Sequence, residues 1–143
     1  MNLKVRFWRL SLALAGAVIL AACGGGGGGG TGGGATINAL DTLKFDPATA
    51  SIPTGGQVTI KNTGAQQHNW VLVSTDKADA VAAAALAKGG DATGVDGVLA
   101  GGKLIAAGGS ETLTVSAPAG SYTYLCTVAG HYQAGMKGTL TVQ

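Results

Sequence analysis

The sequence contains few charged residues and has no arginine beyond residue 9. When Lys4, Arg6 and Arg9 are set aside, six lysines stand against seven acidic residues, a net side-chain charge of about −1. Proteins that bind nucleic acid need a basic face, so this balance argues against that class. Beyond residue 22 no apolar run approaches the roughly 20 residues of a membrane helix, which excludes a polytopic membrane protein. No repeat with a period of about 20–50 residues is present.

Cysteine is also scarce, and the first of the two cysteines ends a segment typical of an export signal. The three basic residues named above precede the apolar run Leu10–Leu20, which is too short to span a membrane comfortably. The run continues into Ala-Ala-Cys23, which resembles the lipobox of bacterial lipoproteins. The resemblance implies cleavage before Cys23 and lipidation of its thiol, and two or three acyl chains would anchor the protein stably. The alternatives are an ordinary signal peptide and a Cys23–Cys126 disulfide.

Residues 24–34 are ten glycines and one threonine. Glycine has no side chain to bury and the most backbone entropy to lose, so this stretch predicts a disordered tether. A phosphate-binding loop is excluded, because no strand precedes the glycines and no helix or lysine follows them. We therefore expect a lipoprotein signal peptide at 1–22, a lipidated cysteine with its tether at 23–34, and one folded domain of about 109 residues at 35–143.

Alternating apolar and β-branched residues dominate the folded domain and predict about eight short strands. The expected strands are Thr36–Phe45, Ser51–Ile52, Gln57–Asn62, Asn69–Val73, Gly97–Leu99, Glu111–Ser116, Ser121–Cys126 and Lys137–Val142. Asp76–Lys88 differs, because it is alanine-rich, begins with acidic residues and ends with a lysine, as a helix prefers. The pattern predicts an all-β fold, a Greek-key β-sandwich or barrel with one short helical flap.

Four side chains in this domain can bind a soft metal. Cys126, His131 and Met136 fall within eleven residues, and His68 stands at the start of a predicted strand. Taken singly, a histidine, a buried thiol or a methionine is more often a packing residue. Together, a thiolate, two imidazoles and a thioether are the ligand set of blue-copper sites. Gly130 and Gly135 permit the tight bends that bring such ligands together.

The segment Gln66–Val73 and the spacing Cys-x4-His-x4-Met resemble the cupredoxins, and most closely the auracyanins. The resemblance implies one type 1 copper per chain. Its ligands would be His68, Cys126 and His131 in a plane, an axial Met136, and a possible weak axial carbonyl at Gln67. It also implies that Asn69 and Thr127 link the two ligand segments beside the sulfur. One departure is Thr-Val-Ala-Gly between Cys126 and His131, where close relatives have a proline-containing loop.

The expected function is therefore a membrane-anchored blue copper protein that carries single electrons and is not an enzyme. The family resemblance implies a quinol-oxidising complex as donor and a cytochrome c or reaction-centre cytochrome as acceptor. We expect an exported monomer, anchored by lipid on the periplasmic or extracytoplasmic side. The alternatives are a zinc site, a nucleophilic Cys/His enzyme, a copper-storage lipoprotein, and an extracytoplasmic interaction sandwich without a redox role. An intense blue colour on addition of Cu(II) would separate the electron carrier from all four.

Overall fold

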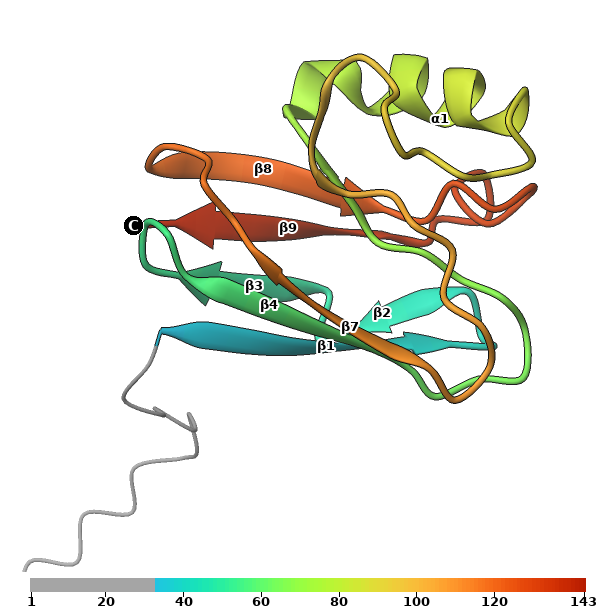
Figure 1. Cartoon of the computed structure of the whole chain (residues 1–143), viewed down its shortest axis with the longest axis horizontal. Coiled ribbons are helices and arrows are strands. Elements are labelled where there is room, and N and C mark those ends of the chain that lie inside the picture. Colours follow the sequence, from blue (N-terminus) through green and yellow to red (C-terminus); the bar gives the residue numbers. More distant parts are fainter. Residues whose placement is uncertain (1–32) are drawn as a thin grey trace, which may run out of the picture.

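The computed structural model describes residues 33–143, and these form two facing β-sheets with one α-helix on the outside (Figure 1). The predicted signal peptide, Cys23 and nearly all of the glycine tether lie outside the described residues. No helix within residues 33–143 has the length and apolar character needed to cross a membrane.

The two sheets contain four and five strands. The first has the order β2 (Lys44–Asp46), β1 (Gly34–Leu40), β4 (Gln57–Asn62) and β7 (Ser110–Thr114). The second has the order β3 (Thr49–Ile52), β9 (Lys137–Val142), β8 (Gly120–Leu125), β5 (Val71–Val73) and β6 (Val98–Gly101). Two pairs, β1 with β4 and β3 with β9, are parallel, and the other pairs are antiparallel. The chain crosses between the sheets after β2, β3, β4, β6 and β7, which gives the predicted sandwich with one more strand than expected.

The predicted strand Thr36–Phe45 was wrong in one respect, because the structure divides it into two strands. The chain turns at residues 41–43, and Leu43 has a φ of 55°, a left-handed conformation that cannot continue a strand. β2 then folds back and pairs antiparallel with the end of β1. The turn places Asp41 at one end of the sandwich.

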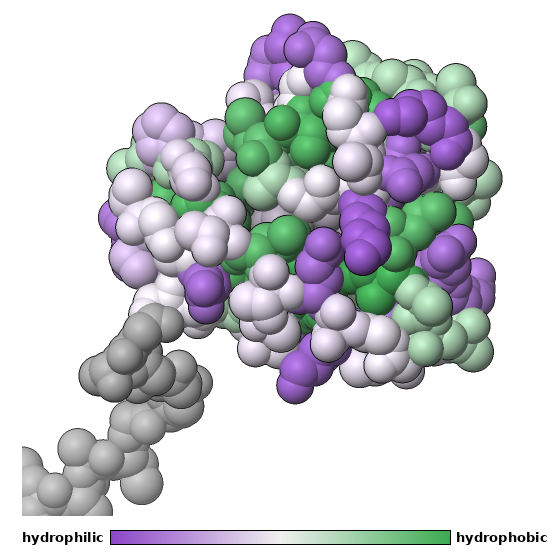
Figure 2. Space-filling view, viewed as in Figure 1, coloured by the Kyte–Doolittle hydropathy of each residue, from purple (hydrophilic) through white to green (hydrophobic). Residues whose placement is uncertain are grey.

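The core between the sheets follows the period-two pattern of the sequence. Val58, Ile60 and Leu140 are fully buried, and burial of each such side chain contributes about 1.5–3 kcal/mol. Trp70 is also fully buried, and its ring centroid lies 5.6 Å from that of Tyr124. The molecular surface in Figure 2 is a mixture of hydrophilic and hydrophobic side chains.

The helix packs on the outer face of the second sheet, so this sheet is covered on both sides (Figure 1). A short 3-10 turn, Thr75–Lys77, leads into α1 (Ala78–Leu86), slightly shorter than the predicted Asp76–Lys88. The buried residues of α1 are spaced as one helical face and pack with β5 and β8: Ala78, Val81, Ala82 and Ala85. The chain that leaves α1 reaches Gly90, whose carbonyl contacts the candidate site described below.

Candidate metal centre

The candidate ligands converge at one end of the sandwich because two segments meet there. His68 precedes β5 and forms an isolated bridge with Ile105, with backbone hydrogen bonds of 3.2 and 2.7 Å. Cys126 directly follows β8, and the loop from Cys126 to Met136 returns the chain to β9. Within that loop the Cys126 N–H donates to the Met136 carbonyl at 3.1 Å, and the Met136 N–H donates to the His131 carbonyl at 3.0 Å. The backbone therefore holds the three loop residues together.

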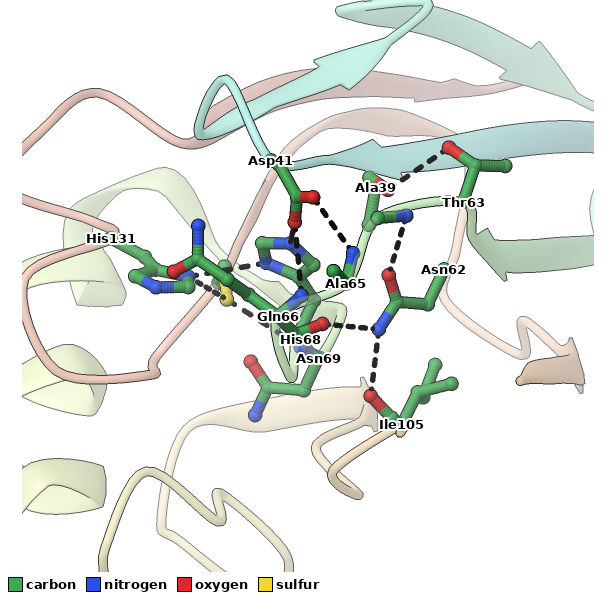
Figure 3. Close-up of polar contacts among 12 residues, drawn as sticks. Ala39, Asp41, Asn62, Thr63, Ala65, Gln66, His68, Asn69, Ile105 and His131 are labelled. Carbon is green, nitrogen blue, oxygen red and sulfur yellow. Dashed lines mark hydrogen bonds and ion pairs between the residues drawn. The ribbon is translucent and has the colours of Figure 1, made fainter. Parts of the chain in front are cut away.

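Three ligand atoms face one another at this point. His68 Nδ1 lies 3.2 Å from His131 Nδ1, and Cys126 Sγ lies 3.4 Å from His131 Nδ1. The ligand atoms of all three residues lie within 4.8 Å of one another, and all three residues are buried. Figure 3 shows both imidazole rings beside the sulfur atom. Metal–nitrogen bonds of about 2 Å at trigonal angles place two nitrogens roughly 3.5 Å apart, so the arrangement fits one small ion.

The electrostatics of the pocket also fit a cation. Burial lowers the pKa of His68 and of His131, which favours the neutral imidazole with a lone pair free for a metal. Burial raises the pKa of the Cys126 thiol, and the N–H groups of Asn69 and Val128 only partly oppose this. A metal ion bound by these three residues would stabilise the thiolate and displace its proton.

A family comparison decides the identity of the fold and its metal. Residues 34–143 match the family described as copper binding proteins of the plastocyanin/azurin type. The chain is a cupredoxin. Copper is the metal of this family, and His68, Cys126 and His131 form a potential copper site. The predicted resemblance is thus confirmed.

Individual relatives agree with this family. Over 116 residues the chain is 42% identical to auracyanin-B of Chloroflexus aurantiacus, and this match covers 73% of this chain and 49% of that protein. It is 40% identical over 114 residues to auracyanin-A of the same organism, and this match covers 71% of this chain and 68% of that protein. The dithionite-reduced auracyanin of the photosynthetic bacterium Roseiflexus castenholzii superposes with a TM-score of 0.70 at 36% identity, covering 80% of this chain and 99% of that chain. This cupredoxin spans about half the length of auracyanin-B.

A buried polar network links the two ligand segments of this cupredoxin. The Thr127 N–H donates to Asn69 Oδ1 at 2.8 Å, and Asn69 Nδ2 lies 2.8 Å from Thr127 Oγ1. Asn69 Nδ2 also lies 2.9 Å from the Gly90 carbonyl and 3.0 Å from the Gly102 carbonyl. The Asn69 N–H points at Cys126 Sγ from 3.5 Å. The structure brings together the predicted pair, and adds two backbone carbonyls that residue types alone do not reveal.

The two candidate axial groups are placed less directly. Met136 is fully buried within the core cluster and is held by the backbone bonds to Cys126 and His131 given above. Gln67 has an exposed side chain and immediately precedes His68. Coordination by the Met136 thioether and by the Gln67 carbonyl remains a prediction.

Proposed function

We propose that this cupredoxin carries single electrons through one type 1 copper held by His68, Cys126 and His131, with Met136 as a weak axial ligand. The observation that carries the proposal is the convergence of two buried imidazole nitrogens and one thiol, with His131 Nδ1 3.2 Å from His68 Nδ1 and 3.4 Å from Cys126 Sγ. Copper bound there supplies a Cu(II)/Cu(I) couple that gains and loses one electron. The chain's own part is to hold the donors in place, and the Asn69–Thr127 network supports that role.

The two histidines differ in their surroundings, which supports different roles. His68 is fully buried, whereas 6% of His131 is exposed, beside the exposed small residues Ala129, Gly130 and Ala134. We assign His131 as the electron port, because a ring edge near the surface shortens the path to a partner. Beyond residue 9 the side chains carry a net charge of about −1, which favours apolar docking over long-range steering.

The proposal includes export and anchoring. The lipobox-like end of the leader supports lipidation of Cys23, and the glycine-rich segment would tether the domain to the extracytoplasmic side of the membrane. A quinol-oxidising complex and a cytochrome c or reaction-centre cytochrome are the proposed partners of a monomeric carrier. The intact mass of membrane-extracted protein should exceed that of the chain starting at Cys23 by its acyl groups, and a soluble product cleaved elsewhere would contradict this part.

The deciding experiment is a Cu(II) titration of the metal-free domain, followed by a potentiometric titration. We expect one copper per chain, an intense blue band, and a reversible one-electron transition. Cys126→Ser should abolish the band, because the thiolate is the charge-transfer partner. A copper-storage protein would instead bind copper without a reversible couple or without the blue band. Either outcome would remove the electron-carrier proposal.

A further inference from the structure

One nitrogen of His68 has no hydrogen-bond partner although it is buried. Nδ1 of His68 faces the candidate metal site, and Nε2 points away from it. When a metal takes Nδ1 of a neutral imidazole, the ring proton must reside on Nε2. A buried N–H without an acceptor costs about 1–3 kcal/mol, so this position needs an acceptor.

A carboxylate in the turn between β1 and β2 lies close to this nitrogen. Asp41 Oδ1 lies 3.7 Å from His68 Nε2 (Figure 3). The Ala65 N–H donates to Asp41 Oδ2 at 2.7 Å, and the Gln66 N–H donates to Asp41 Oδ1 at 3.0 Å. Each carboxylate oxygen can accept two hydrogen bonds, so Oδ1 retains capacity for the histidine. The main chain just before His68 therefore holds this carboxylate beside the ring.

The same segment is fixed from its other side, which leaves the carboxylate little freedom to withdraw. Asn62 Nδ2 donates to the Gln66 carbonyl at 2.8 Å and to the Ile105 carbonyl at 3.0 Å. A Cβ at Gly64 would lie 2.2 Å from Asp41 Oδ1, so only glycine allows the chain to pass this close. Residues 64–66 and the carboxylate thus form one packed unit against His68.

We propose that Asp41 is the positioning residue of His68 and accepts the Nε2–H bond when Nδ1 binds copper. This rests on the copper site proposed above. A small rotation of either side chain shortens the 3.7 Å distance between His68 Nε2 and Asp41 Oδ1 to that of a hydrogen bond. The carboxylate then fixes the tautomer and the ring orientation and makes the imidazole a stronger donor. A more electron-rich ligand favours Cu(II), so Asp41 lowers the reduction potential.

The test compares Asp41→Asn with Asp46→Asn. The first variant keeps an oxygen for the turn but loses the charge. The second removes an equal charge from the exposed Asp46 on β2, which has no hydrogen bond or ion pair with His68 within residues 33–143. We expect Asp41→Asn to weaken Cu(II) binding about 10–100-fold and to raise the potential. Asp46→Asn should change the Cu(II) affinity less than threefold and should leave the reduction potential close to that of the parent.

A second measurement does not depend on electron transfer. In the diamagnetic Cu(I) form, ¹⁵N NMR should show His68 Nε2 protonated and slow to exchange with water, and Asp41→Asn should speed that exchange at least tenfold. Unchanged exchange, Cu(II) affinity and potential in Asp41→Asn would overturn the inference while the parent remained blue. A parent without a blue band would instead overturn the proposed function itself.

Discussion

The Tyr132 hydroxyl donates a 2.7 Å hydrogen bond to Asp79 Oδ1, which joins the loop containing His131 to the first turn of α1. Lys137 Nζ lies 5.5 Å from the centroid of the Tyr132 ring. The carboxylate acceptor, with burial as a lesser cause, raises the pKa of Tyr132 to about 12. The helical flap is therefore tied to the ligand loop through a side chain adjacent to His131.

This pair predicts a loss of stability in strong alkali. The pKa of Tyr132 is raised to about 12 in the folded state, against about 10 in the unfolded chain. The contribution of the Tyr132–Asp79 hydrogen bond to the free energy of unfolding is thus fully present below pH 10 and is lost as the pH rises through 12. Tyr132→Phe should cost about 0.5–1.5 kcal/mol at neutral pH and flatten this part of the pH profile. Urea unfolding of both proteins between pH 8 and about 12 measures the difference, and parallel profiles would contradict the assignment.

Removal of the Asn69 amide should destabilise the domain strongly. In Asn69→Ala the Thr127 N–H and the carbonyls of Gly90 and Gly102 lose a buried partner. We expect a loss of about 2–4 kcal/mol in the free energy of unfolding and an altered blue band, because the two ligand segments are no longer linked. Thr127→Ser, which keeps the hydroxyl, should cost about 1 kcal/mol. Equal losses in the two variants would show that packing, and not the amide network, dominates.

Replacements of Met136 should shift the reduction potential and leave copper bound. The axial bond in such sites is long and weak, so the three other ligands hold the metal. Met136→Gln should lower the potential, because a harder oxygen favours Cu(II), and Met136→Leu should raise it. Met136→Leu conserves volume in this buried position and should cost less than about 1.5 kcal/mol. Potentiometric titration checks both signs, and a raised potential in Met136→Gln would contradict axial ligation.

Histidine deletion followed by imidazole rescue tests the assignment of the electron port. His131→Gly should leave an opening among exposed small residues that external imidazole refills, with recovery of the blue spectrum. His68→Gly should resist rescue, because His68 is fully buried and its outer side is closed by the unit of residues 64–66 and Asp41. Ala134→Lys should slow electron transfer to a partner by placing a charged side chain among the exposed small residues beside His131. Equal rescue of both glycine variants would require the port assignment to be abandoned.

The chemistry of the candidate site was visible in the sequence because each ligand type is rare here and three of them share one loop. The strands around the core were visible because side chains such as Val58 and Ile60 alternate with polar ones. The role of Asp41 was not visible, because the strand-like pattern from Thr36 to Phe45 gives no sign of a turn. The turn became evident only from the left-handed backbone of Leu43 in the structure.

Backbone groups and strand pairings were hidden for a related reason. Every residue type has a backbone carbonyl, so no sequence pattern predicts that the carbonyls of Gly90 and Gly102 accept hydrogen bonds from Asn69. The parallel pairing of β1 with β4 joins segments whose periodicity fits either direction. Only the folded chain shows which groups meet.

The buried indole of Trp70 gives the domain its own optical reporter. Trp70 is the one tryptophan of residues 33–143; it has no exposed surface, and its Nε1 has no hydrogen-bond partner. An indole so shielded from water emits at short wavelength, and it shifts to longer wavelength when unfolding admits solvent. Because Trp70 is two residues from His68, its fluorescence should also be quenched by bound copper. One emission spectrum therefore reports both the folded state and the occupancy of the site.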